Sequence, residues 1–182
     1  MELTSEQAHH LGGAAAAVIA LVLLLSEAGV VKGRWVRFLV PAALLVWGVR
    51  SITHPLPRGS EASAGHEGVQ HIWIGIAVTL VGSIELLRAT GRLTHQFWGA
   101  VLPAGLIVVA ALFFFHAQHV AGVPPIVLAV QHRILGATLG VAALTKVLSE
   151  RAAGFRTAWP VTVLLFGIEL MLYTEGVATH QH

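Results

Sequence analysis

Six long apolar stretches constrain this chain more than any other feature of its sequence. A membrane-spanning helix needs about 20 consecutive, mainly apolar residues, and six segments approach that length. They cover approximately residues 8–26, 35–52, 71–87, 97–116, 126–148 and 159–176. Only 11% of the 182 residues are charged, whereas a soluble domain usually carries about 25%. The sequence therefore predicts an all-α integral membrane protein, in which residues 1–182 form a single domain of six transmembrane helices.

The first apolar stretch could be mistaken for a secretory leader. However, residues 1–10 contain Glu2 and Glu6 and no lysine or arginine, and the basic cluster follows the apolar run. This order is the reverse of a secretory signal. We expect an uncleaved first helix.

Lysine and arginine are distributed unequally between the two sides of the predicted bundle. The connections after the first, third and fifth stretches hold eight of them: Lys32, Arg34, Arg37, Arg88, Arg92, Lys146, Arg151 and Arg156. The other side holds Arg50, Arg58 and Arg133. Because basic residues favour the cytoplasmic side, we expect both termini to lie outside a bacterial-type inner membrane.

A short motif recurs three times along the chain. VQHIWIG at residues 69–75 returns as VQHRILG at residues 130–136, and a looser copy, QAHHLGG, occupies residues 7–13. Their histidines, His9, His71 and His132, are 62 and 61 positions apart, and each is followed by a glycine four positions later. Internal repeats of this kind determine architecture. We predict three helical hairpins, with repeat units of approximately 1–62, 63–124 and 125–182.

The turns within the three units also share a pattern of glycine, arginine, tryptophan and proline. The sets are Gly33, Arg34, Trp35 and Pro41; Gly91, Arg92, Trp98 and Pro103; and Gly154, Arg156, Trp159 and Pro160. Proline is tolerated in the first turn of a helix, where its missing N–H has no partner in any case. Each proline therefore predicts the start of an even-numbered helix.

The predicted topology gathers histidines on the outer side, with only His95 on the cytoplasmic side. Packing of the hairpins around a pseudo-threefold axis would arrange His9, His71 and His132 in a ring. Three converging imidazoles are a recurrent ligand set for zinc or copper. The candidate metal ligands are His9, His71, His116, His119 and His132.

Further polar residues lie beside these candidates. Thirteen residues after the three prolines come His54, His116 and Tyr173, which would form a second ring. The possible additional ligands are His10, His54, His66 and Tyr173. Four neighbours of the histidines could orient an imidazole by hydrogen bonding: Glu67, Gln70, Gln118 and Gln131.

Simpler explanations exist for several of these residues. Selection against lysine and arginine in outer loops leaves histidine and glutamine as neutral polar residues there, where they cap helices or touch headgroups. The glycines after the histidines either leave room for a flat macrocycle or let helices approach closely, and we favour close packing. Glu85 and Arg88 are expected to pair at the membrane interface.

The ionisable residue Glu169 lies well inside the sixth predicted span. Such residues are functional candidates by default, because burying them in a membrane is costly. Glu169 is therefore a candidate proton or ion site. It can alternatively serve a structural role, paired with Arg133 or hydrogen bonded to Thr138.

The outward histidines, in particular HAQH at residues 116–119 and QHR at residues 131–133, resemble the CopD-like membrane proteins of bacterial copper handling. The resemblance implies copper or another transition-metal ion as cofactor, and a periplasmic metal carrier or other membrane subunits as partners. The chain departs from a Cu(I) pathway because its only methionines are Met1 and Met171, and thioethers favour Cu(I). Cu(II), zinc and haem iron remain open.

Three functions are compatible with the sequence. The favoured one is a histidine-rich metal-binding or metal-transfer protein. The second is a quinol-linked cytochrome with haem b held by histidines from different helices, and the third is a structural subunit of a larger membrane complex. No soluble catalytic motif supports an enzyme, no cysteine is available for thiolate metal sites, and the net charge of +2 does not indicate a nucleic-acid partner.

Overall fold

In a computed structural model of the chain, described for residues 4–53, 61–115 and 124–175, six α-helices form and no strand is present. Within residues 61–67 only the backbone is described. The helices are α1 (Ser5–Glu27), α2 (Leu39–Thr53), α3 (Glu61–Ala89), α4 (Val101–Phe114), α5 (Pro125–Arg151) and α6 (Ala158–Met171). Short 3-10 helices precede the even-numbered ones: η1 (Arg34–Phe38), η2 (Gln96–Ala100) and η3 (Ala153–Phe155).

Five helical segments are long and apolar enough to cross a membrane. They are Ser5–Glu27, Arg34–Thr53, Gly68–Ala89, Gln96–Phe114 and Pro125–Arg151. Large apolar side chains point outward from them, including Val18, Val46 and Ile107, as expected for contact with lipid. The protein is therefore a multi-pass membrane protein. The predicted sixth span is not confirmed, because α6 has only 14 residues.

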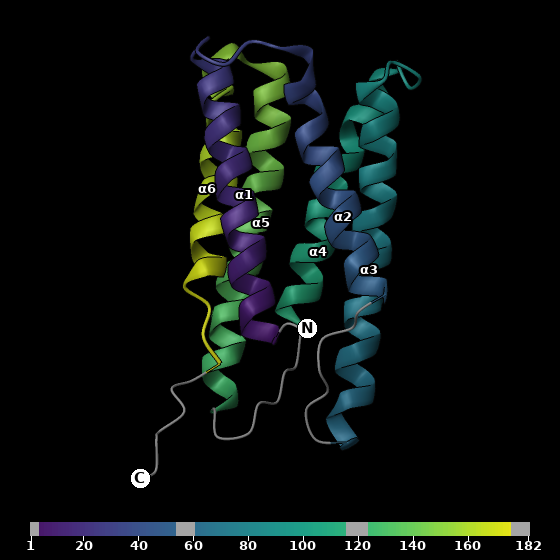
Figure 1. The fold of residues 1–182 in the computed structure, drawn as a ribbon, viewed down its shortest axis with the longest axis vertical. Coiled ribbons are helices and arrows are strands. Elements are labelled where there is room, and N and C mark those ends of the chain that lie inside the picture. The colour runs from purple at the N-terminus through teal and green to yellow at the C-terminus, as the bar shows by residue number, and fades with distance from the viewer. Residues whose placement is uncertain (1–3, 54–60, 116–123, 176–182) are drawn as a thin grey trace.

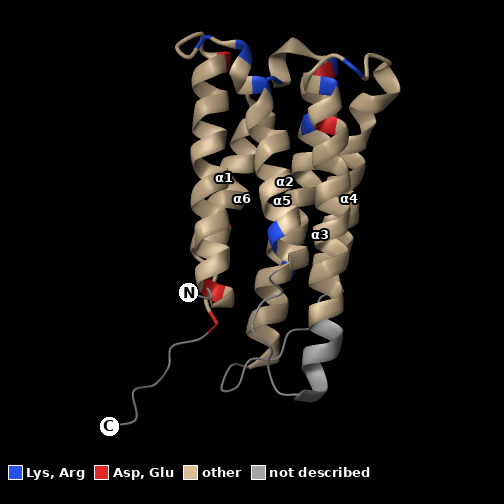
Figure 2. Cartoon of the chain, turned by 45° about the vertical axis from the view of Figure 1, so that its right-hand side comes forward, with Lys and Arg blue, Asp and Glu red and all other residues tan. Residues whose placement is uncertain are grey.

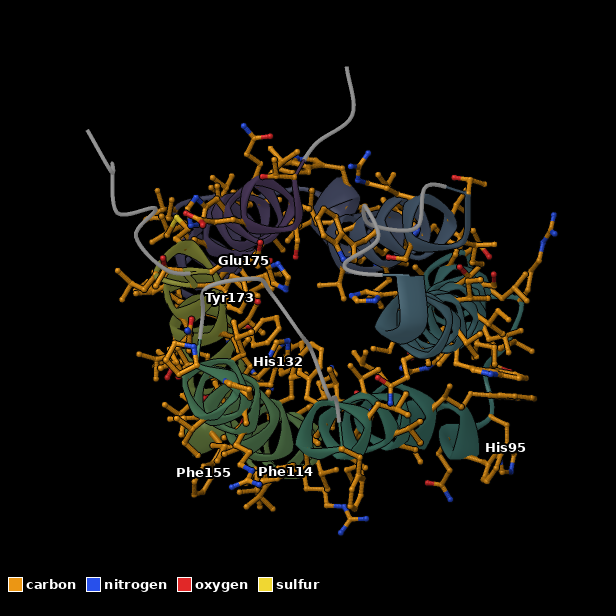
Figure 3. The ribbon with its side chains drawn as sticks, turned by 90° about the horizontal axis from the view of Figure 1, so that it is seen from below. His95, Phe114, His132, Phe155, Tyr173 and Glu175 are labelled. Carbon is orange, nitrogen blue, oxygen red and sulfur yellow. The ribbon has the colours of Figure 1, made fainter. Side chains whose placement is uncertain are left out.

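The helices run alternately up and down around a central axis (Figures 1 and 3). The connections 28–38, 90–100 and 152–157 lie together at one end, where lysine and arginine gather (Figure 2). We call this the basic end. The opposite end contains the starts of α1 and α5, and with them His9 and His132. We call it the histidine end.

Each odd-numbered helix packs most closely against the even-numbered helix that lies before it in the ring. The close pairs are α1 with α6, α3 with α2, and α5 with α4. The contact between α1 and α6 closes the ring by joining the two ends of the chain. By contrast, α1 and α2 touch only sparsely, although they are neighbours in sequence.

Glycine allows these three close pairs to form. A Cβ added at Gly13 would lie 2.5 Å from the Gly167 carbonyl oxygen of α6. Added at Gly75 or Gly136, it would lie 2.9 Å from a carbonyl oxygen of α2 or α4, respectively. Real Cβ atoms are not found that close, so each of these glycines is required for backbone-to-backbone contact. Close packing, one of the two predicted roles of these glycines, is thus the observed one.

The three close contacts, which we call the seams, are related by the repeat. The carbonyls that face the seam glycines belong to Gly48, Ala110 and Gly167. Each of these residues lies seven positions after the proline of its unit: Pro41, Pro103 and Pro160. Each proline is the third residue of its helix and is buried. The three seams thus share one spacing in the sequence, and the threefold repeat stays a prediction.

The turns at the basic end agree in the first two units and differ in the third. Gly29 and Gly91 adopt positive φ values of 74° and 79°, a conformation that glycine reaches without steric cost. In both turns the next residue donates from its N–H to the carbonyl five residues earlier. Gly29, rather than the predicted Gly33, is therefore the counterpart of Gly91. The third unit has Ala152 at this point, and the chain leaves α5 in an extended conformation.

Two glycines of α5 provide a matched test of the seam. Gly136→Ala should destabilise the protein by about 1–3 kcal/mol, because the new methyl group meets the backbone of α4. Gly140→Ala, with no atom within 4 Å of the added Cβ, should be neutral or stabilising, since alanine favours helix by about 1 kcal/mol. Denaturant unfolding of the purified protein in mild detergent, followed by circular dichroism, measures both. Equal stability of the two variants would show that the α4–α5 seam is not tightly packed.

Candidate functional site

The imidazoles of His9 and His132 are held in the same way by their own helices. Nδ1 of His9 lies 2.8 Å from the carbonyl oxygen of Ser5, and Nδ1 of His132 lies 2.8 Å from that of Leu128. A carbonyl only accepts hydrogen bonds, so Nδ1 carries the proton in both rings. In the neutral ring the lone pair is then on Nε2. A backbone carbonyl bonded to one ring nitrogen is the arrangement that typically orients a metal-ligating histidine.

His9 and His132 come from different helices and lie close together. Their ring centroids are 6.3 Å apart, with an angle of 87° between the planes. Tyr173, which follows α6, stacks on His9 at 4.1 Å and meets His132 edge-on at 5.6 Å. Phe113 of α4 packs against the other side of the cluster, 5.8 Å from His132. Four aromatic rings, from α1, α4, α5 and the chain after α6, thus meet at the histidine end. Figure 3 labels two of them, His132 and Tyr173.

His71 belongs to the same neighbourhood. It lines a central cavity together with His9, and it is near enough to both His9 and His132 for their charges to interact. The three repeat histidines therefore share one end of the bundle. Within the described ranges, however, no three histidine, aspartate or glutamate side chains are already arranged around one point as a metal ion requires.

The seams explain why these three histidines lie at the same height along the axis of the bundle. Each repeat histidine lies four residues, about one helical turn, before the glycine that contacts the neighbouring helix. Because the three glycines meet equivalent positions of α6, α2 and α4, the histidines one turn away occupy equivalent positions on α1, α3 and α5. The spacing of the sequence motif is thus converted into proximity at one end.

The chain after α6 is held by three side chains, of which Gln131 was predicted to orient an imidazole and His10 was predicted as a possible ligand. Gln131 donates from Nε2 to the Thr174 carbonyl and accepts from the Thr174 N–H, both at 3.0 Å. His10 donates from Nε2 to the Tyr173 carbonyl at 2.8 Å. Glu6 accepts from the Glu175 N–H at 3.3 Å. These bonds hold Tyr173 in place, and both polar atoms of the Gln131 amide bind backbone rather than an imidazole.

Several predicted site residues lie outside the described residues, and another, Gln70, bonds to a backbone carbonyl. His54, His116, Gln118 and His119 fall in the ranges that are not described, and the side chains of His66 and Glu67 are likewise not described. Gln70 donates to the carbonyl of Phe115 at 3.5 Å. At the basic end, the predicted pair between Arg88 and Glu85 is confirmed at 2.8 Å.

Glu169 is bonded to one of its two predicted structural partners. Thr138 donates from Oγ1 to Glu169 Oε1 at 2.7 Å. Oε2 of Glu169 is buried and has no hydrogen-bond partner among the described residues. The other predicted partner, Arg133, is an exposed residue within the described range 124–175 and forms no ion pair with Glu169. A structural link between α5 and α6 is therefore present at Glu169, and a role as proton or ion site stays a prediction.

A cavity of about 280 Å³ lies along the axis of the bundle and is lined by all six α-helices. Alanine, glycine, aliphatic and aromatic side chains make up most of its wall, including Trp47 and Trp159. The other lining residues are His9, Arg50, Ser51 and His71. Arg50 was not among the predicted site residues, although its place inside the predicted span 35–52 was a signal for a buried charge.

Comparisons with known proteins do not identify this chain. No family model, no curated protein and no solved structure matches it. The CopD-like resemblance and the metal ligands that it implies stay predictions.

Removal of the Gln131 amide should loosen the end of α6. Gln131→Ala takes away the acceptor of the Thr174 N–H, so hydrogen exchange at that amide should accelerate about tenfold, as loss of about 1.4 kcal/mol predicts. Mass spectrometry of the exchanging protein in detergent measures this. Gln96→Ala, an exposed glutamine at the basic end, is the control. An unchanged rate at Thr174 would mean that other contacts hold the segment.

The bond between Thr138 and Glu169 makes a separate prediction about stability. Thr138→Val should cost about 1–3 kcal/mol, because it leaves the half-buried carboxyl group of Glu169 without its hydrogen-bond donor. The double variant Thr138→Val/Glu169→Leu should recover most of that loss, since both partners are then apolar. Denaturant unfolding in detergent compares the two variants. A double variant less stable than Thr138→Val would indicate that Glu169 stabilises the protein by other contacts.

Proposed function

We propose that the protein binds a transition-metal ion at its histidine end, for metal binding or transfer. His9 and His132 are the primary ligands, each through Nε2, and His71 is the third. The observation that carries the proposal is the matched pair of Nδ1 bonds, which places the lone pair of each neutral ring on Nε2, the nitrogen that would coordinate a metal, in two histidines of different helices.

The separation of the two rings supports a shared ion. Metal–imidazole bonds are about 2.0–2.1 Å long, so two imidazoles on nearly opposite sides of one ion have ring centroids approximately the observed 6.3 Å apart. A smaller angle between the ligands would bring the two rings closer together. His71 completes the set by a change of side-chain rotamer toward the other two. Imidazole ligands suit Cu(II) and zinc, and the scarcity of methionine disfavours Cu(I).

Two observations favour an ion over haem b, the alternative proposed cofactor. Tyr173 packs against both His9 and His132, so a macrocycle between these imidazoles would have to displace a buried phenol ring. The cavity of about 280 Å³ is also at the lower limit of the roughly 300–1,000 Å³ typical of sites for larger ligands. A bare metal ion requires neither displacement of Tyr173 nor a larger cavity.

The charge distribution supports an orientation for the site. The eight lysines and arginines of the basic end favour the cytoplasmic side, so the histidine end and both termini face outward. In a bacterial-type inner membrane this places the metal toward the periplasm. A periplasmic carrier or another membrane subunit can then deliver or receive the ion.

Metal titration of the purified full chain in mild detergent tests this proposal. Cu(II) or zinc should bind with one ion per chain, without an intense Soret band in the visible spectrum. His9→Ala, His71→Ala and His132→Ala should each weaken binding by more than about tenfold, the loss that even outer-shell changes can cause.

His95→Asn is the matched control, because His95 caps η2 at the basic end through Nδ1 and asparagine preserves a cap. It should bind metal like the unmodified protein. A Soret band that disappears in His71→Ala would instead support the haem alternative. Absence of both metal and haem, with all three alanine variants folded, would leave the structural-subunit function.

A further inference from the structure

Among the residues that the structure describes, Arg50 is the one lysine or arginine that lines the central cavity. It belongs to the membrane-spanning segment Arg34–Thr53 and is half-buried. No carboxylate or carbonyl of the described residues forms an ion pair or hydrogen bond with its guanidinium group. Charged groups within membrane spans normally pair with another group or mark a ligand pathway. An arginine in this position is suited to an anionic group, and above all to a carboxylate, which matches its planar fork.

The rest of the cavity is suited to an apolar chain. Beyond His9, Arg50, Ser51 and His71, the wall consists of small, aliphatic and aromatic side chains that continue to Val40 and Trp159 near the basic end. These polar residues belong to the histidine-end halves of α1, α2 and α3. A ligand that fills the cavity therefore has one polar end and a long apolar body.

The cavity also has a route to the lipid. The contact between α1 and α2 is sparse, and it includes Gly12 of α1 against the ring of Trp47, where an added Cβ would lie 3.0 Å away. Since neither backbone-to-backbone packing nor a hydrogen bond joins the described residues of these two helices, this is the most sparsely packed wall of the ring. Separation at this point would admit a chain from the bilayer laterally.

We propose that the central cavity binds a single-chain anionic amphiphile, a long-chain carboxylic acid, with its carboxylate on Arg50 and its chain among the helices. The volume of about 280 Å³ fits one slender chain better than a two-chain phospholipid. The proposal does not require a bound metal ion, because it rests on Arg50 and the apolar wall.

Binding of cis-parinaric acid to the purified full chain in a nonionic detergent, with chelator present, tests the proposal. Trp47 and Trp159 line the cavity, so their fluorescence should transfer to the bound probe and saturate at one probe per chain. Palmitate should displace the probe, and hexadecanol at the same concentration should not. Arg50→Gln should weaken binding of the carboxylate about tenfold or more, because one charge-assisted bond is lost.

Arg133→Gln is the matched control, since Arg133 is exposed and does not line the cavity. It should bind the probe like the unmodified protein. Ala43→Phe places a large side chain in the cavity and changes no charged residue. It should also reduce binding of the probe, and circular dichroism checks that the variant is folded. Equal displacement by palmitate and hexadecanol, or equal losses in Arg50→Gln and Arg133→Gln, would overturn the proposal, because simple partitioning or surface charge would then explain the signal.

Discussion

Backbone contact at three glycines is the interaction on which the rest of this structure depends. In lipid, helices gain little from burying apolar side chains against each other, so association relies on close packing and interhelical hydrogen bonds. Gly13, Gly75 and Gly136 provide that packing against α6, α2 and α4. Each seam fixes the rotation of an odd-numbered helix about its own axis. The direction of every side chain one turn away is then determined as well.

The histidine end inherits its geometry from these seams. His9 and His132 each use one ring nitrogen to bond their own helix, so no partner residue is needed to orient them. The α1–α6 seam brings Tyr173 against both rings, and the bonds from Gln131 and His10 to the chain after α6 keep it there. The aromatic cluster is therefore built from both ends of the sequence. Loosening either end would separate its members.

The central cavity follows from the same arrangement. Because close packing is confined to three seams between neighbouring helices, the helices stand around the axis instead of filling it. Small residues on the inner faces, such as Ala15 and Ala43, leave space that larger side chains would occupy. The three seams thus produce both the cluster of aromatic rings at the histidine end and the central cavity along the axis of the bundle.

Much of the secondary structure could be predicted from the sequence, because apolar length and proline mark helices locally. The predicted segments 8–26 and 126–148 lie within α1 and α5. The start of α3 at Glu61 rather than near residue 71 was missed, since residues 61–70 are too polar to count toward a span. The shortness of α6 was missed for the opposite reason, because apolar residues continue beyond the end of the helix at Met171.

The candidate site was less accessible to prediction, because a single sequence does not show which helices meet. The repeat predicted that His9, His71 and His132 would share one end of the bundle, and a ring of three was the simplest arrangement. The stacking of Tyr173 on His9 depends on closure of the ring between α1 and α6, which no local pattern encodes. The same holds for Gln131, whose partner Thr174 is 43 residues away.

The central functional claim is that imidazoles from different helices share one metal ion. X-ray absorption spectroscopy of the copper- or zinc-loaded protein tests it most directly. The account predicts two or three imidazole nitrogens at about 2.0–2.1 Å from the metal, with fewer in His132→Ala. A spectrum with oxygen ligands only, or with an imidazole count unchanged in both His9→Ala and His132→Ala, would contradict it.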